Sequence, residues 1–179
     1  EWVNLAGGGG TITTSQGNLK VDHGGDGNKQ IYGTMGVSSG KWYYEVELTG
    51  GTDNWFTLVG WRNENGYHTY YHSTDANGWA IRNTDGKKMT NDTYTAYATG
   101  AGDSTVCILM AAIDVDAKKC WFGINGTWGD SGNPATAANP AYSSMGGTVF
   151  RPALSQYYSA TTSHTNFGQR AFKYTAPSG

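Results

Sequence analysis

Two glutamates, Glu45 and Glu47, stand two positions apart in the segment KWYYEVEL at 41–48 and are the residues best suited to acid–base chemistry. On an extended strand they share a face with their Cα atoms ~7 Å apart. From there two carboxyl groups can approach the ~5–5.5 Å separation found in retaining glycoside hydrolases. The continuation EVELTG supplies no further acid to complete such a site. Because alternating strands turn polar residues outward, we interpret both glutamates as the solvated or salt-bridged face of a half-buried strand, and a glycoside hydrolase remains an alternative.

A hairpin is expected where the strands VCILMAAID and KKCWFGI meet at the link VDAK, with Asp114 facing Lys119. Asp114 and Asp116 are then turn residues, because a calcium loop requires more oxygen ligands than these two supply. In this register Cys107 lies about 20 Å from the position opposite Cys120, at ~3.3 Å per residue, too far for a disulfide. Both thiols are predicted to be reduced and buried. One core face should hold Cys107, Leu109, Ala111, Ile113, Cys120, Phe122 and Ile124, while Trp121 points to the other side.

The segment YHTYYH at 67–72 places His68 and His72 at the spacing of helical zinc ligands. The residues around them are typical of a loop, and no third ligand follows. A tyrosine-rich contact surface is therefore favoured over a metal site. The run GGGG at 7–10 lacks the Lys-Ser/Thr of a phosphate-binding loop. We expect neither a metal nor any other cofactor.

The composition of the 179-residue chain indicates an all-β protein, since it has 27 Gly, 13% aromatic residues and no helical run. The length suits a single domain over 1–179, with 1–10 as a linker or joint to a preceding region. A net charge of -2 with scattered cations argues against a nucleic-acid partner. The longest apolar run, VCILMAAI at 106–113, is far shorter than the ~20 residues of a membrane helix, so no membrane insertion is expected.

Strands are predicted along most of the chain. In 41–48, Trp42 shares a face with Tyr44, Val46 and Leu48, and this face should be buried. The segment NWFTLVGW at 54–61 is apolar on both faces, which fits a central strand covered from both sides. Further strands are expected at 17–21, 29–35, 78–81, 148–154, 162–168 and 172–174. The polar stretch 125–147 is predicted to be a long loop, with Asn125 and Gly126 forming a tight turn.

Six segments occur in the order and spacing typical of one known family: GKWYYEVEL at 40–48, LVGW at 58–61, GWAI at 78–81, AAIDVDAKKCWFGINGTW at 111–128, RPALS at 151–155 and NFGQRAFKY at 166–174. Together they resemble a SPRY domain. The resemblance implies a bent antiparallel β-sandwich, a concanavalin-like jelly roll with little or no helix. It also implies a non-catalytic recognition module whose edge loops bind a protein or peptide.

The polar opening segment, TITTSQGNLKVDHGGDGNKQIYGTMGVSSGKWYYEV at 11–46, resembles SPRY domains of phage virion proteins. This similarity implies a virion surface or fibre domain that binds a host protein or glycan, or another virion protein. A bacterial extracellular lectin-like or adhesive domain is the alternative. Assembly into a homo-oligomer within a longer chain is left open.

Two predicted loops, 63–77 and 125–147, are rich in large amphipathic side chains of the kind that dominate binding hot spots. The alternative is that these aromatic residues fold back as lids over the ends of the sandwich. The predicted ligand-binding residues are Tyr67, Tyr70, Tyr71, Arg82, Trp128 and Tyr142.

Overall fold

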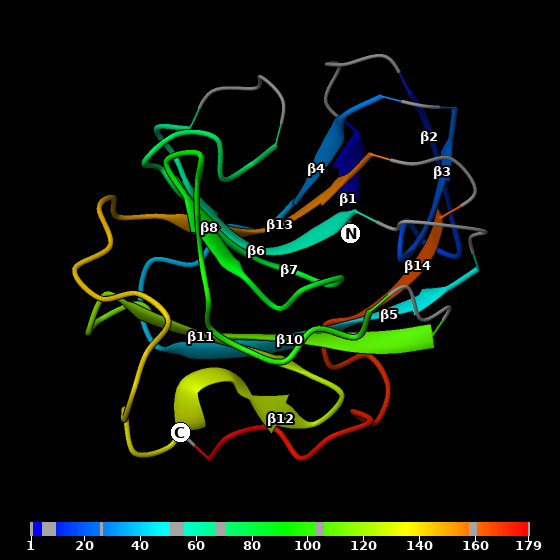
Figure 1. Cartoon of the computed structure of the whole chain (residues 1–179). Coiled ribbons are helices and arrows are strands. Elements are labelled where there is room, and N and C mark those ends of the chain that lie inside the picture. The colour runs from blue at the N-terminus through cyan, green and yellow to red at the C-terminus, as the bar shows by residue number, and fades with distance from the viewer. Residues whose placement is uncertain are drawn as a thin grey trace.

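The computed structural model contains two antiparallel β-sheets that face each other across a shared core (Figure 1). It describes residues 2–4, 10–25, 27–50, 56–66, 71–102, 106–157 and 161–178. Within these residues the helical content is one 3-10 turn, η1 (Gly129–Ser131). The all-β sandwich predicted from the sequence is confirmed.

Each sheet contains seven strands in the described part of the chain. Sheet A has the order β1 (Trp2–Asn4), β4 (Lys29–Gly33), β13 (Phe150–Gln156), β6 (Thr57–Asn63), β7 (Gly78–Arg82), β8 (Lys88–Thr90) and β9 (Thr93–Thr95). Sheet B has the order β12 (Thr127–Trp128), β11 (Lys119–Ile124), β10 (Val106–Asp114), β5 (Lys41–Thr49), β14 (Thr161–Asn166), β3 (Lys20–Gly24) and β2 (Thr11–Ser15).

The β10–β11 hairpin has the predicted register, with Asp114 opposite Lys119 and Cys120 opposite Ile113. The seven residues predicted to share its core face are all buried in the main core cluster. Trp121 is also buried, but it points to the other side, where its indole nitrogen donates to the carbonyl of Ala138. Both cysteines are free and buried, as predicted. Local alternation and a short turn were therefore sufficient signals for this hairpin.

The central strand β6 is buried along its whole length, as the apolar pattern of 54–61 predicted. Its inward residues Val59 and Trp61 belong to the main core. Leu58, on the outer face, packs with Ala80 of β7 and Met89 of β8 in a second small cluster. The strand is thus covered on both sides, which gives sheet A a rigid centre.

Two predictions about strand ends are wrong. Trp42 shares its face with the buried Tyr44, Val46 and Leu48, yet it is 47% exposed. Trp42 is the second residue of β5. At this end of the strand the alternation of side chains continues, but residues of the opposite sheet no longer cover the inward face. Residues 172–174 form no strand; they belong to a tail that crosses the outer face of sheet B and ends near β11, shown in red in Figure 1.

The N-terminal region holds strands that the sequence patterns did not reveal. The strand expected at 17–21 begins at Lys20, and β2 precedes it. Within 1–10, interpreted above as a joint, Trp2–Asn4 pairs with β4. Trp2 is 1% exposed and its indole donates to Thr165 Oγ1 at 2.9 Å. The two sheets are therefore connected by a side-chain hydrogen bond near this edge.

Candidate functional site

The glutamate pair considered for hydrolysis is divided between two structural roles. Glu45 is only 3% exposed, so its assignment to a solvated or salt-bridged face is wrong. Its carboxylate accepts hydrogen bonds from the backbone N–H groups of Lys173 at 2.8 Å and Tyr174 at 2.9 Å, and from the hydroxyl of Tyr43 at 2.8 Å. Glu47 is salt-bridged as expected, to Arg170 at 3.5 Å. The Glu45 carboxylate therefore holds the C-terminal tail against sheet B.

His72, the described member of the histidine pair, is fully buried rather than open to a metal. Its Nδ1 lies 2.8 Å from Ser155 Oγ, and its carbonyl accepts from Arg62 at 2.6 Å. Burial, assisted by the nearby Arg62 charge, lowers the pKa of His72 to about 3, so the ring is neutral near pH 7. His68 lies outside the described residues. Within the part of the chain that the structure describes, no three His, Cys, Asp or Glu side chains gather as metal ligands.

The aspartates of the β10–β11 link carry out the turn chemistry that was predicted. Asp114 Oδ1 accepts from the N–H of Ala117 at 2.8 Å within the turn. Asp116 Oδ2 accepts from the N–H of Gly40 at 2.9 Å and thereby fixes the start of β5. The Asn125–Gly126 turn is also confirmed, with φ of 49° and 84°. These residues are architectural.

Two of the predicted ligand-binding residues come together on the outer face of sheet A. Tyr71 packs on Phe56 with ring centroids 4.7 Å apart. The Arg82 guanidinium carbon lies 4.3 Å from the ring centroid of Tyr94 and 5.1 Å from that of Phe56. We refer to these four half-buried residues, Phe56, Tyr71, Arg82 and Tyr94, as the aromatic–arginine cluster. It contains two tyrosines and an arginine, which are residue types enriched in binding hot spots.

Arg82 forms an ion pair with Asp85, which Lys87 also contacts at 3.3 Å. Its Nε donates to Asp85 Oδ1 at 2.8 Å, and its Nη2 donates to Asp85 Oδ2. Although burial opposes the effect, hydrogen bonds from Arg82 and from the backbone of Lys87 lower the pKa of Asp85 to about 2. The hydrogen bond to Asp85 in turn raises the pKa of Arg82. The bidentate pair fixes the guanidinium against the two rings, so the cluster is pre-organised.

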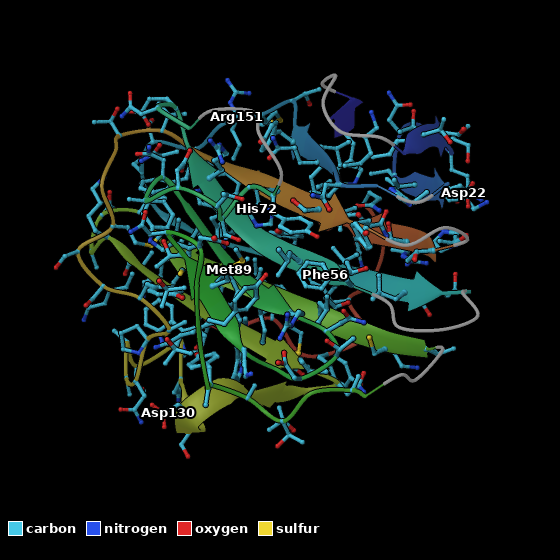
Figure 2. All side chains as sticks on the ribbon, turned by 45° about the horizontal axis from the view of Figure 1, so that its top comes forward. Asp22, Phe56, His72, Met89, Asp130 and Arg151 are labelled. Carbon is cyan, nitrogen blue, oxygen red and sulfur yellow. The ribbon has the colours of Figure 1, made fainter. Side chains whose placement is uncertain are left out.

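The cluster rests on a rigid base. Leu58, Ala80 and Met89 lie beneath it with no exposed surface, and they come from the adjacent strands β6, β7 and β8. Figure 2 labels Phe56 and Met89 on this part of the molecule. Side chains supported by a packed sheet lose little further freedom when a partner binds.

The remaining predicted residues do not join this cluster. Tyr67 and Tyr70 lie outside the described residues. Trp128 packs edge-on against Tyr43, with centroids 6.1 Å apart, and lines a groove of about 620 Å³. Tyr142 is half-buried against the core beside Lys88, whose Nζ lies 5.1 Å from the ring centroid. The structure thus brings together Tyr71 and Arg82 and places Trp128 and Tyr142 elsewhere.

Sequence reasoning missed Phe56 and Tyr94 as members of the site. Tyr94 lies on the short β8–β9 hairpin, whose turn residues Asn91 and Asp92 both have positive φ, 47° and 54°. The sequence MTNDTYT carries that hairpin signal, since Asn and Asp favour such turns and Thr and Tyr favour strands. Phe56 precedes a central strand, and nothing local distinguishes it from a core residue.

Comparison with known proteins agrees with this architecture. The family model for the SPRY domain matches residues 41–170, which is more than half of the chain. The chain belongs to the SPRY domain family. Its fold is similar to that of the SPRY domain of human HERC1, with a TM-score of 0.66 and 17% sequence identity over 89% of this chain and 94% of that chain. Among curated proteins, no relative of this sequence was found.

SPRY domains are in general protein-binding modules without catalytic activity. The role of Glu45 as an anchor for the tail is in keeping with that general property. The search for membrane-spanning segments gave no helix of sufficient length and apolarity in the described residues.

Proposed function

We propose that this SPRY domain binds a partner protein through the aromatic–arginine cluster on the outer face of sheet A. The observation that carries the proposal is the packing of Arg82 against the rings of both Phe56 and Tyr94, which also contact each other edge-on, with Tyr71 extending the same surface. Tyrosine and arginine are, with tryptophan, the side chains enriched in binding hot spots. All four residues are partly exposed above a fully buried base.

The chemistry of the cluster favours an apolar or aromatic segment of the partner. Asp85 pairs with Arg82 and also with Lys87 at 3.3 Å, so the Arg82 guanidinium is held in an ion pair and the surface presents mainly ring faces and methylene groups, with the Lys87 ammonium at its edge. A partner residue that covers these rings would gain from dispersion and from removal of apolar surface from water.

A displayed library of random peptides selected on the domain tests the proposal. We expect retrieved peptides to lose about 2 kcal/mol or more of binding free energy on Tyr94→Ala. The melting temperature of this variant should change little, because Tyr94 lies on an edge hairpin. Trp128→Ala is the matched control, a half-buried aromatic residue on the other sheet. Peptides that bind Tyr94→Ala as tightly as the wild-type domain but fail on Trp128→Ala would locate binding elsewhere.

For its biological setting, we propose a phage virion surface or fibre domain whose partner is a host protein, a host glycan or another virion protein. The support is the polar opening segment 11–46, which resembles virion SPRY domains. A bacterial extracellular adhesive domain is the alternative setting. Mass spectrometry of purified particles that carry the gene tests this: recovery of the chain from particles supports the virion, and recovery only from the medium or cell surface supports the alternative.

A glycan is the second candidate ligand, and the groove beside Trp128 is the observation that favours it. The groove is lined by Tyr97 and Trp128 together with the polar residues Thr127, Asp130 and Ser131. Aromatic faces beside hydroxyl and carboxylate groups can stack on and hydrogen-bond to a sugar ring. An array of bacterial polysaccharides tests the glycan candidate. Binding that is lost in Trp128→Ala supports a glycan site at this groove, and the absence of any binding on the array contradicts it.

A further inference from the structure

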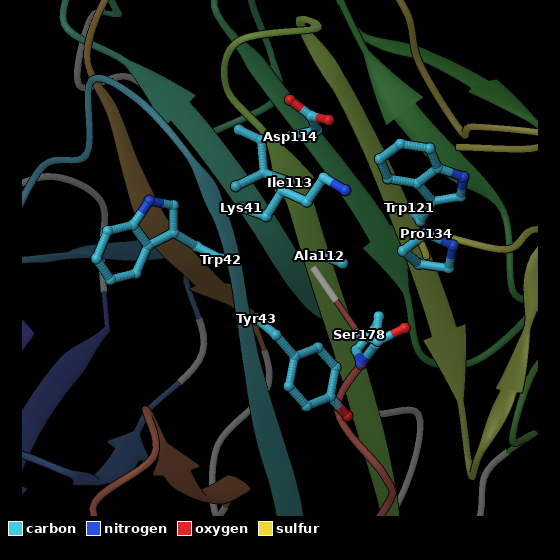
Figure 3. A pocket seen from close by; sticks show the side chains of 10 residues that line it. Lys41, Trp42, Tyr43, Ala112, Ile113, Asp114, Trp121, Pro134 and Ser178 are labelled. Atoms are coloured by element: carbon cyan, nitrogen blue, oxygen red, sulfur yellow. The ribbon is translucent and has the colours of Figure 1, made fainter. Parts of the chain in front are cut away.

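A second, separate recognition site is indicated at the start of β5, where the inward-facing Trp42 is exposed to solvent. Trp42 is opposite Ile113 in the β5–β10 register, and Ile113 is only 2% exposed. Two residues further on, Tyr44 is 1% exposed on the same face. Trp42 itself is 47% exposed, although it lies on the strand face that is buried at its neighbours. Figure 3 shows its ring projecting from β5 away from Tyr43 and Trp121.

An apolar pocket of about 170 Å³ lies beside Trp42, under the 34–40 connection that passes from sheet A to sheet B. Rings of Tyr44, Trp61 and Phe167 contribute to its lining, with Tyr44 5.2 Å from Trp61 and 5.4 Å from Phe167 between centroids. These contacts make a stiff apolar lining. Its volume suits one large side chain rather than a whole ligand.

The rim of the pocket is also apolar and pre-organised. Met35 is 71% exposed and lines the pocket. The indole nitrogen of Trp42 donates to the carbonyl of Ser39 at 2.8 Å, which fixes the ring. Met35 and Trp42 are two of three large hydrophobic residues exposed among the residues described, the third being Val106. A pair of adjacent exposed apolar side chains around a pocket is characteristic of an interaction surface.

One charged side chain beside the pocket specifies the chemistry of its occupant. Arg151 does not line the pocket itself, but its Nη1 donates to the carbonyls of two lining residues, Thr34 at 2.8 Å and Gly33 at 3.4 Å, which places the guanidinium at the rim. No carboxylate in the described part of the chain forms an ion pair with Arg151.

We propose that this pocket binds a peptide segment of a partner protein in which a large apolar side chain lies next to a carboxylate. The apolar side chain enters between Trp42 and the ring-lined floor, and the carboxylate lies at the rim near Arg151. Positive charge without an acidic partner on the protein side provides the electrostatic complementarity.

This site is independent of the aromatic–arginine cluster. Trp61 lies near the last residue of β6, whereas Phe56 directly precedes its first residue. Phe56 and Arg151 are well separated in Figure 2. The cluster lies on the outer face of sheet A, and the pocket opens between the sheets.

Two small probes that differ only in charge test the proposal by NMR titration. N-acetyl-leucine carries the apolar side chain and a carboxylate, and N-acetyl-leucinamide is its neutral match. We expect both to shift the indole N–H signals of Trp42 and Trp61, assigned with Trp42→Phe and Trp61→Phe, and the carboxylate probe to bind about three- to tenfold more tightly. In Arg151→Met the two probes should bind equally.

Trp42→Ala should weaken both probes while leaving the spectrum of the folded domain otherwise intact, since the side chain is half exposed. Tyr94→Ala is the control at the other site and should leave both affinities unchanged. Equal affinities of the two probes for the wild-type domain, or shifts confined to residues away from the pocket, would overturn the proposal. If selected peptides do not bind at the aromatic–arginine cluster while both probes still bind at the pocket, the function proposed above is overturned and this site is not.

Discussion

Glu45 offers the sharpest test of how the C-terminal tail is held on sheet B, because its buried carboxylate accepts three hydrogen bonds, two of them from the tail. In Glu45→Ala the N–H groups of Lys173 and Tyr174 and the hydroxyl of Tyr43 lose their acceptor. A hydrogen bond to a charged group contributes about 1.5–3 kcal/mol. The tail can move away and admit water, which limits the total, so we expect a loss of about 2–4 kcal/mol in the free energy of unfolding.

The assay is urea and thermal unfolding of Glu45→Ala beside Glu47→Ala, its matched control on the same strand face. A loss of about 3 kcal/mol lowers the melting temperature by roughly 6–12 °C for a domain of this size. Glu47 forms an exposed pair with Arg170, with side chains 36% and 55% exposed, so its removal should cost about 0–1 kcal/mol.

Amide hydrogen exchange locates the effect. In the wild-type domain the amides of Lys173 and Tyr174 should be protected, and in Glu45→Ala they should exchange quickly while the amides of β10 stay protected. Equal destabilisation by the two alanine variants, or unprotected tail amides in the wild-type domain, would refute the anchoring role. A reducing-sugar assay on Glu45→Gln addresses the glycoside hydrolase alternative, and activity that this substitution abolishes would reinstate it.

Three further outcomes are expected. The pKa of His72 is lowered to about 3, so the folded state resists protonation of this ring. The contribution of His72 to stability is therefore complete above its unfolded pKa of about 6.5 and falls as the pH drops towards 3. Between pH 7 and pH 5 the stability difference between wild type and His72→Asn should shrink by about 2 kcal/mol, and a constant difference in urea unfolding would contradict this. Burial raises the pKa of Cys107 to about 12 and also raises that of Cys120, so neither thiol should react with Ellman reagent until the protein is unfolded, and rapid reaction of the native protein would show an open core. Trp42→Ala should cost about 1 kcal/mol or less, against about 3–5 kcal/mol for the buried Trp61→Ala, and equal changes in melting temperature would mean that Trp42 is covered.

The parts of the fold that could be predicted are those with a local cause. The β10–β11 register follows from two alternating strands and a short turn, so Asp114 opposite Lys119 could be derived directly. Trp42 obeys the same alternation, but its exposure depends on where the opposite sheet ends, which no local pattern records. Glu45 was misjudged for a similar reason, because its partners are backbone groups that lie 128 and 129 residues away.

The candidate site could be predicted only in part. Tyr71 and Arg82 were identified by residue type, and the structure brings them together through β6, β7 and the hairpin that carries Tyr94. Trp128 and Tyr142 have the same amphipathic chemistry but pack against other parts of the sandwich. Residue type predicts what can bind, whereas sheet order decides which of these side chains share a surface.

An NMR amide chemical-shift map of the domain with its tightest selected peptide tests the central claim most directly. Binding through the aromatic–arginine cluster predicts the largest changes at residue 56, at 80–82 and along the hairpin at 88–95, with Tyr94→Ala removing them. Changes confined to 125–131, or to 33–42, with the cluster signals unmoved and Tyr94→Ala without effect, would contradict it.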